Sequence, residues 1–261
     1  MRITVLGLGK IGAWLARELA VEHQVAGFDT DSSIEIQGIT RLGSLEEIQS
    51  FKPELFINAV CLQNTINAFQ TATPFLPKEC VIGDVASIKT GLVEYYEQTG
   101  SEFFSIHPMF GPTNANLQSL KGENAVIASE GNASARQFFK SFFEQRGIRV
   151  FECSIQEHDK MMAYSLTTPF VSSLVFAACM EQGIVPGTTF AKHLDIASRL
   201  LSEDDALIYQ VLFNPNSLKQ LDKITSRLEF LKHVIKANDS EEAKRFLAGL
   251  RKNINTGRKE G

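Results

Sequence analysis

The chain has 261 residues, of which 44% are hydrophobic and 21% charged, a composition typical of a soluble globular protein. Its formal net charge of −4 argues against nucleic-acid binding through bulk electrostatics. We find no apolar run of the roughly 18 residues that a membrane span requires, so we expect no membrane association.

The first half alternates short apolar runs with amphipathic stretches. The apolar runs predict strands buried on both faces of a sheet, at residues 3–6, 25–28, 54–60, 80–85, 103–106 and 125–128. Helical periodicity predicts the helices between them, at residues 10–22, 64–73, 88–98 and 133–146. This alternation predicts an α/β fold with a doubly wound, mostly parallel sheet and right-handed crossovers.

Strand signals fade after about Cys153, and amphipathic helices are predicted at residues 157–182 and 217–236. Asp239 and Glu242 have the spacing of a capping box that opens a last helix to about Asn253, followed by a frayed tail. We therefore divide the chain into a dinucleotide-binding domain, residues 1–154, and an all-α domain, residues 155–261.

The four cysteines show neither CxxC nor metal-ligand spacing, so we expect no metal site. Cys61, Cys80 and Cys179 lie in apolar stretches, which predicts buried free thiols. Free thiols favour a reducing compartment. The sequence opens with a strand-like run that leaves no room for a signal peptide, so we expect a cytoplasmic protein.

A GxGxxG motif lies between the first predicted strand and helix, which is the Rossmann-type context for dinucleotide binding. Asp29 ends the second predicted strand, 20 residues after Gly9, where a carboxylate accepts hydrogen bonds from the adenosine ribose. This carboxylate repels a 2′-phosphate, and we expect no arginine beside it, which favours NAD over NADP. The expected coenzyme contacts are Gly7, Leu8, Gly9, Lys10, Ile11, Gly12, Asp29, Thr30, Val60 and Cys61.

Ser87 and His107 each follow a different predicted strand, so both side chains are expected at the ligand crevice of the sheet. Pro108 cannot continue a strand ladder, so we expect the imidazole to project from a constrained loop. A histidine with a pKa near 6.5 is a suitable base for an alcohol at pH 7. The spacing alone equally allows a histidine that packs in the core.

Four sequence elements occur in order behind the GxGxxG motif: Asp84–Lys89 (DVASIK), His107–Pro112 (HPMFGP), Glu157–Asp159 (EHD) and Ser198–Asp204 (SRLLSED). In these elements the chain resembles the prephenate/arogenate dehydrogenase family of tyrosine biosynthesis, over nearly its whole length. HPMFGP is the most specific of them. No chorismate mutase segment precedes the first strand, so the resemblance is to the monofunctional form.

The resemblance implies an NAD(P)-dependent oxidative decarboxylation. A hydride leaves the carbinol carbon of a cyclohexadienol while the ring carboxylate leaves as carbon dioxide, which gives an aromatic product. His107 would be the base that polarises the ring hydroxyl, and Ser87 would orient that hydroxyl. Arg199 would hold a substrate carboxylate, although an ion pair with Glu203 is the alternative. Lys89 is expected among the substrate-binding residues, where it would support the site electrostatically; otherwise it simply begins a helix.

Relatives carry a histidine in the helix after EHD, whereas this chain has Thr167 and Thr168 in that helix, which we expect to donate hydrogen bonds to the substrate. Arogenate has an ammonium group where prephenate has a keto oxygen, so a nearby acid would favour arogenate. Residues 113–121 contain no acid and end in Lys121, which favours prephenate. His158 of the EHD element is interpreted as a structural link between the domains.

Two alternatives and one assembly remain to be tested. A related β-hydroxyacid or imine reductase would use a second-domain lysine as proton donor, for which Lys160 is the candidate. An NAD-binding sensor would dock a partner protein and catalyse nothing. The helical region has more apolar faces than one short bundle buries, and in the family it forms the dimer interface, so we expect a homodimer.

Overall fold

The computed structural model describes residues 1–110, 120–181, 183, 185–203 and 205–260. Within them, eight strands form one sheet in the order β3-β2-β1-β4-β5-β6-β7-β8. The first six strands of this order are parallel, β7 is antiparallel to β6, and β8 is parallel to β7. The strands are β1 (Arg2–Leu6), β2 (Gln24–Phe28), β3 (Thr40–Arg41), β4 (Leu55–Asn58), β5 (Val81–Asp84), β6 (Phe103–Pro108), β7 (Asn124–Ala128) and β8 (Arg149–Cys153).

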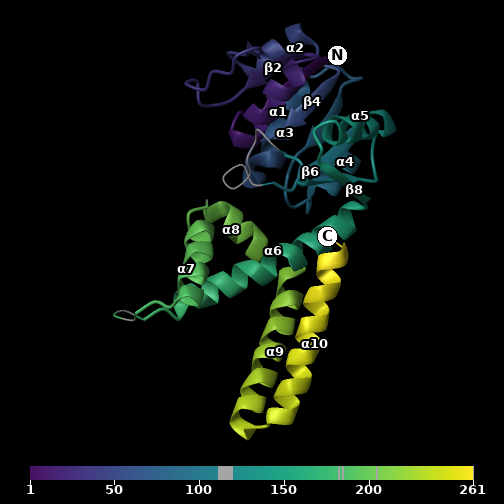
Figure 1. The fold of residues 1–261 in the computed structure, drawn as a ribbon. Helices are drawn as coiled ribbons and strands as arrows, with labels where there is room; N and C mark the ends of the chain where they lie inside the picture. Colours follow the sequence, from purple (N-terminus) through teal and green to yellow (C-terminus); the bar gives the residue numbers. More distant parts are fainter. Residues whose placement is uncertain (111–119, 182, 184, 204, 261) are drawn as a thin grey trace.

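Helices cover both faces of this sheet and bury two apolar clusters (Figure 1). On one face, α1 (Lys10–Ala20) and α5 (Ala133–Glu144) meet through Trp14 and Phe142, whose ring centroids are 5.8 Å apart. On the other face lie α2 (Ile48–Phe51), α3 (Thr65–Ala72) and α4 (Leu92–Thr99). The predicted doubly wound, mostly parallel sheet is therefore confirmed.

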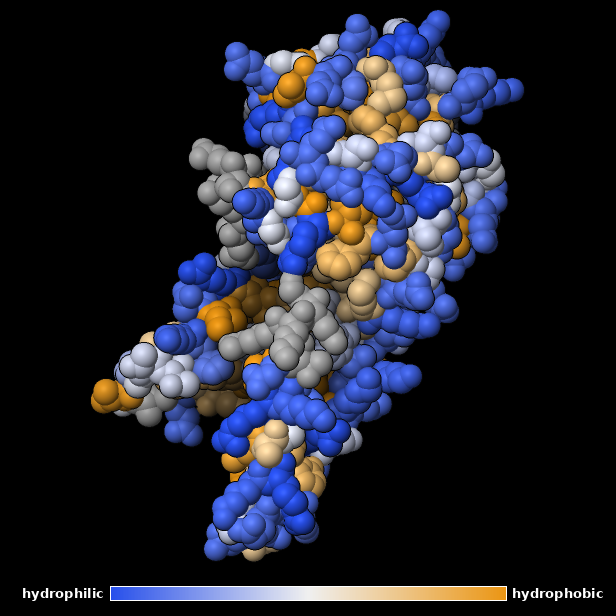
Figure 2. Space-filling view, turned by 45° about the vertical axis from the view of Figure 1, so that its right-hand side comes forward, coloured by the Kyte–Doolittle hydropathy of each residue, from blue (hydrophilic) through white to orange (hydrophobic). Residues whose placement is uncertain are grey.

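The rest of the described chain is helical. The long helix α6 (Ile155–Ala178) leaves the sheet next to β8, and α7, α8 and α9 pack against it, while α9 and α10 form a hairpin that projects away from the sheet (Figure 1). These helices are α7 (Thr188–Leu201), α8 (Asp205–Leu212), α9 (Ser217–Ala237) and α10 (Ser240–Glu260). Figure 2 shows mainly hydrophilic side chains on one face of the molecule, interrupted by hydrophobic patches that extend onto the helical part.

Helix α6 is the one described helix that is long and apolar enough to cross a membrane by length and composition. The prediction that no stretch meets this measure was wrong. The core helix of a soluble protein passes the same test, and α6 has the central position of such a helix. In the single chain, 28% of the residues in its apolar window are buried, and the others are half-buried or exposed.

Several local predictions need correction. The two-residue strand β3 and the strand β8, whose side chains are exposed or half-buried, were not predicted. Pro108 does belong to β6, where it pairs with Ala125 at the end of the strand. The next hydrogen bond between the two strands is donated by the Met109 N–H to the Asn124 carbonyl (2.9 Å), so the missing N–H of Pro108 costs little. The last helix continues to Glu260 instead of ending near Asn253.

The cysteine prediction was right about bonding and partly wrong about burial. All four thiols are free. Cys80 is buried, which raises the pKa of its thiol to about 12, whereas Cys61 and Cys179 are exposed. Their apolar sequence neighbours therefore do not enclose them. Among the described residues, no group of three or more histidine, cysteine or acidic side chains is arranged to hold a metal ion.

Candidate active site

A pocket lies at the carboxyl edge of the parallel strands, where the sheet meets the helical part. The strand order reverses between β1 and β4, which is the position at which such sheets bind ligands. Most side chains that line the pocket are apolar, and none of the described lining residues is acidic, lysine or arginine. They are Ile11, Ala59, Val60, Cys61, Leu62, Gln63, Val85, Ala86, Ser87, His107, Pro108, Met109, Phe110, Met162, Leu166, Phe170, Leu207, Gln210 and Val211.

The turn between β1 and α1 has the shape of a phosphate cradle. Gly7 has φ +85, and a Cβ on Gly12 would lie 1.9 Å from the Gly7 carbonyl oxygen, so the close packing of this turn requires both glycines. A Cβ on Gly9 would meet nothing within 4 Å, which leaves open space beside the first N–H groups of α1. These groups favour an anion. The turn therefore fits the pyrophosphate of a dinucleotide.

Asp29 lies beside this turn. Its carboxylate accepts hydrogen bonds from the backbone N–H of Leu8 (2.6 Å) and of Asp31 (2.9 Å). The Leu8 side chain is buried in the core, so Leu8 contributes its backbone to the turn. The carboxylate is thus fixed next to the cradle, at the position where it would meet the adenosine ribose. Thr30 follows it and is exposed.

An arginine does lie close to Asp29, which corrects the premise for the NAD preference. Arg41 on β3 donates from Nη2 to the carbonyl oxygens of Asp29 (2.8 Å) and Asp31 (3.1 Å). Its guanidinium also lies over the Phe28 ring, 5.7 Å from the centroid. Arg41 is 12 residues from Asp29 in sequence and comes close through the pairing of β2 with β3. A cation and a carboxylate therefore share the region where coenzymes differ.

His107 lines the pocket from the end of β6 and is 9% exposed. Its Nδ1 lies 3.0 Å from Nε2 of His158, and Nδ1 of His158 lies 3.0 Å from Oδ1 of Asp159. Burial, together with the nearby His158 and Lys89, holds the pKa of His107 well below 6.5. The imidazole is therefore neutral at pH 7, as a proton acceptor must be.

Local structure fixes each member of this group. Phe110, three residues after His107, packs edge-on against Trp14 of α1, with ring centroids 5.1 Å apart. Ser154 and Glu157 form a capping box at the start of α6, which places His158 and Asp159 directly after the cap. The EHD element thus combines a helix-capping residue, Glu157, with His158, which contacts His107, and Asp159, which contacts the backbone N–H of Lys89.

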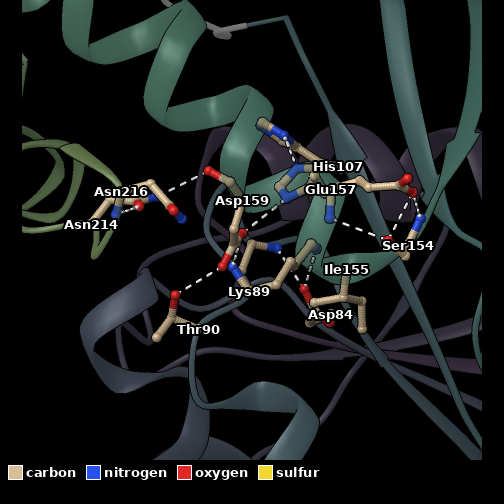
Figure 3. Close-up of polar contacts among 12 residues, drawn as sticks. Asp84, Lys89, Thr90, His107, Ser154, Ile155, Glu157, Asp159, Asn214 and Asn216 are labelled. Carbon is tan, nitrogen blue, oxygen red and sulfur yellow. Dashed lines mark hydrogen bonds and ion pairs between the residues drawn. The ribbon is translucent and has the colours of Figure 1, made fainter. Parts of the chain in front are cut away.

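Lys89 does not begin a helix and does not reach the pocket. It is 2% exposed, and its Nζ donates to Asp84 Oδ1 (Figure 3). It also donates to the Ile106 carbonyl (2.7 Å). Asp84 also accepts a hydrogen bond from the Tyr96 hydroxyl (2.8 Å). The expectation that Lys89 binds substrate is therefore corrected: Lys89 forms a buried ion pair with Asp84 next to the strand that carries His107. The expected electrostatic influence remains, because the ammonium group helps to lower the pKa of His107.

The expected substrate-binding threonines also face elsewhere. Met162, Leu166 and Phe170 recur every four residues and form the α6 stripe that lines the pocket. Thr167 is one position beyond this stripe, about 100° around the helix, and its hydroxyl bonds Ser217 of α9 (2.7 Å). Thr168 is half-buried and does not line the pocket. The two threonines are therefore corrected to positions outside the pocket.

Arg199 lies on α7, outside the residues that line the pocket. Its side chain is 65% exposed and pairs with Asp195 (3.1 Å), four residues before it, instead of Glu203. The structure of one chain thus gives no contact between Arg199 and the pocket, and its role as a carboxylate ligand stays a prediction. Lys160 is exposed and also outside the pocket, which removes the support for the reductase alternative.

Two members of the site are missed as functional residues by the sequence reasoning, which treats His158 as a structural link and gives Asp159 no role of its own. The capping-box spacing of Ser154 and Glu157 can be recognised in the sequence and places His158 and Asp159 near the start of a helix. The contact of His158 with His107 is not readable there, because 51 residues separate them.

Comparison with known proteins identifies the family. Residues 15–152, more than half of the chain, match the family model of the prephenate dehydrogenase nucleotide-binding domain. The chain belongs to the prephenate/arogenate dehydrogenase family. The resemblance seen in the sequence is thereby confirmed, and the family is one of oxidoreductases with a dinucleotide-binding domain.

Relatives within the family carry both substrate names. The chain is 25% identical to the chloroplastic arogenate dehydrogenase 1 of Arabidopsis thaliana over 89% of its own length and 39% of that protein. It is 21% identical to a probable arogenate/prephenate dehydrogenase of Methanocaldococcus jannaschii, over 98% of its own length and 61% of that protein. The chain therefore spans less than two thirds of both relatives.

Solved structures share the fold along the whole chain. The Synechocystis arogenate dehydrogenase has a TM-score of 0.77 at 22% identity, covering 98% of this chain and 99% of that one. The Aquifex aeolicus prephenate dehydrogenase, in complex with hydroxyphenyl propionate and NAD+, has a TM-score of 0.80 at 17% identity, covering 100% and 98%. The family fold thus includes both the sheet and the helical part.

Proposed function

We propose that this chain catalyses the NAD-dependent oxidative decarboxylation of prephenate to 4-hydroxyphenylpyruvate, with arogenate as the alternative substrate. The observation that carries the proposal is a neutral His107 that lines a mainly apolar pocket next to a dinucleotide cradle. A cyclohexadienol ring suits apolar walls that include Met162, Leu166 and Phe170. Membership of the family supports the same reaction class.

Each residue then has a specific task. The first N–H groups of α1 hold the pyrophosphate, and Asp29 accepts hydrogen bonds from the adenosine ribose. NAD, when bound, supplies the acceptor for the hydride. His107 takes the proton of the ring hydroxyl at Nε2, and Ser87, which lines the same pocket, orients that hydroxyl.

The charge of the pocket favours prephenate over arogenate. An ammonium group gains from a nearby carboxylate, and the described residues that line the pocket include no acid. The acid-free stretch in the sequence lies, for residues 113–119, outside the described residues. The names of the relatives include both substrates, so the proposed preference for prephenate rests on the pocket residues alone.

A side-by-side assay tests the function. Purified protein is mixed with prephenate or arogenate, each with NAD or NADP, and the reduced coenzyme is followed by its absorbance. We expect the highest kcat/KM with prephenate and NAD. Turnover of arogenate alone would change the substrate. The absence of turnover with either substrate, in protein that still binds NAD, would favour the non-catalytic sensor.

Exchange of the Asp29 charge is expected to alter coenzyme choice. Asp29→Asn removes the repulsion of a 2′-phosphate, while the Arg41 guanidinium remains beside it. We expect kcat/KM with NADP to rise by about tenfold, equivalent to about 1.4 kcal/mol. Adding Arg41→Ala to Asp29→Asn removes the cation and is the matched control, in which the gain should be lost. A wild-type protein that prefers NADP would contradict the NAD assignment.

We further propose a homodimer formed through the helical region. Large apolar side chains on α7, α9 and α10 are exposed in the single chain, and a second copy would cover them. These include Ile196, Leu201, Leu228, Leu231, Ile235, Leu247 and Leu250. On α6, the side chains of Met161, Tyr164 and Val175 are also exposed. An uncovered surface of this kind favours association with another chain.

Light scattering coupled to size-exclusion chromatography should give a mass near twice 28.9 kDa. Two charges placed in the apolar surface, Leu228→Glu with Leu231→Glu, should shift the protein to a monomer, because a buried unpaired carboxylate opposes association. The double change Lys219→Glu with Lys223→Glu, at exposed polar positions of α9, is the control. A wild-type monomer with full activity would contradict the proposal.

A further inference from the structure

Three buried side chains, His107, His158 and Asp159, form a hydrogen-bonded series that connects the pocket to the start of α6. His107 Nδ1 and His158 Nε2 are 3.0 Å apart, and the two rings are nearly perpendicular, at 78°. His158 Nδ1 and Asp159 Oδ1 are also 3.0 Å apart. His158 is 2% and Asp159 7% exposed, so water does not compete for these contacts. The direction of the hydrogen bonds along this series is therefore determined by the protein groups themselves.

The end of this series that is held in place by the backbone is Asp159. Its Oδ1 accepts a hydrogen bond from the Lys89 N–H (2.8 Å), and its Oδ2 accepts one from the Thr90 hydroxyl (2.8 Å) (Figure 3). Burial alone would raise the pKa of this carboxyl group, but the hydrogen bonds from His158, Lys89 and Thr90 outweigh it and lower the pKa. Asp159 is ionised at neutral pH and acts as an acceptor.

The ionised carboxylate determines the tautomers of both histidines. Because Asp159 only accepts, His158 must carry its proton on Nδ1, and burial keeps His158 neutral by lowering its pKa. A neutral imidazole with a proton on Nδ1 has a lone pair on Nε2, which accepts the Nδ1–H of His107. Nε2 of His107 then carries a lone pair and is the ring nitrogen left for the pocket.

We infer that His158 and Asp159 are positioning residues that hold His107 in the Nδ1–H tautomer, with its basic Nε2 directed to substrate. This role rests on the proposed function of His107 as the base. The proton of the ring hydroxyl moves to Nε2 of His107, no proton is transferred to the Asp159 carboxylate, and the new imidazolium keeps its hydrogen bond to His158. The negative charge of Asp159, one imidazole away, stabilises that cation.

Nitrogen NMR of histidine-labelled protein tests the tautomer without any substrate. The chain has five histidines, so the signals of His107 are assigned by their loss in the His107→Asn variant. At neutral pH we expect Nδ1 of His107 to be protonated and Nε2 to carry the lone pair. A His107 that carries its proton on Nε2 in the wild-type protein overturns the inference, whether or not the protein turns over prephenate.

A matched pair of variants tests the consequence for catalysis. His158→Leu removes the acceptor, and His158→Gln retains one in its side-chain oxygen. We expect kcat to fall by about 10- to 100-fold in His158→Leu, with KM for substrate changed by less than about twofold, and most of kcat to return in His158→Gln. The NMR spectrum should show loss of the Nδ1–H tautomer of His107 in His158→Leu and its retention in His158→Gln.

Three other outcomes of these experiments have a defined meaning. Equal losses of kcat in His158→Leu and His158→Gln, in parallel with equal losses of thermal stability, would assign His158 a structural role and overturn the inference. If His158→Leu does not fold, the wild-type NMR measurement still decides the tautomer. Failure of wild-type protein to act on prephenate and arogenate would overturn the proposed function but leave the tautomer result intact.

Discussion

Replacement of His107 by asparagine is expected to lower kcat by about 10²- to 10⁴-fold, the usual effect of losing a general base. Asparagine retains a polar side chain of moderate size but has no group that takes up a proton at pH 7. The coenzyme cradle is formed by the turn after β1 and by Asp29, so NAD affinity should change little. Steady-state kinetics with prephenate and calorimetric titration with NAD measure the two effects separately.

The pH dependence provides a check on this assignment. The pKa of His107 lies well below 6.5 in the folded protein, so wild-type kcat/KM should stay constant through pH 6.5 and fall only at more acidic pH. The unfolded chain, by contrast, binds a proton at this histidine below about pH 6.5. Unfolding then takes up protons, so stability should decrease as pH falls below 6.5. His107→Asn should weaken this loss of stability, and an unchanged acid dependence would contradict the depressed pKa.

The sequence predicted those parts of the site that depend on one strand end at a time. The glycine turn, Asp29, Ser87 and His107 each follow a predicted strand, and parallel strands bring their carboxyl ends to a common edge. This rule needs the order of elements and no knowledge of side-chain contacts. Val60 and Cys61, which we expect to contact the coenzyme, line the pocket at this edge.

The parts that were predicted wrongly depend on contacts between distant segments. Arg41 reaches Asp29 through β3, a strand of two residues with no hydrophobic pattern. Lys89 is buried with Asp84 and the Ile106 carbonyl as hydrogen-bond acceptors of its ammonium group, whereas its sequence neighbourhood is typical of an exposed helix start. Local patterning describes exposure along a helix or strand, but it does not show which buried charge has a partner.

The threonine error has a different origin. Apolar residues at positions 162, 166 and 170 repeat every four residues and identify a face of α6, so the orientation of Thr167 was accessible from periodicity. The expectation for Thr167 rested on its position in the family resemblance, which does not take account of the helical phase. The helical phase shows that the pocket side of α6 is apolar, whereas Thr167 secures the contact between α6 and α9 through Ser217.

Replacement of Lys89 by methionine is expected to lower the free energy of unfolding by about 3–5 kcal/mol, because it leaves the Asp84 carboxylate buried without its counter-charge. Both side chains are almost inaccessible, at 2% and 0% exposure, and Tyr96 then remains the one described side chain that donates to this carboxylate. Urea denaturation with an unchanged m-value measures the loss. KM for substrate should be unaffected in the fraction that folds.

The double variant Asp84→Asn with Lys89→Met separates a buried ion pair from a substrate ligand. Removing both charges eliminates the unpaired carboxylate, and the amide oxygen introduced at position 84 still accepts from Tyr96, so most of the lost stability should return. A substrate ligand would behave differently, since neutralising Asp84 does nothing to restore a lost contact with a substrate carboxylate. If Lys89→Met instead keeps wild-type stability and raises KM severalfold, the buried ion pair is not what selects lysine here, and the ammonium group must reach the pocket during turnover.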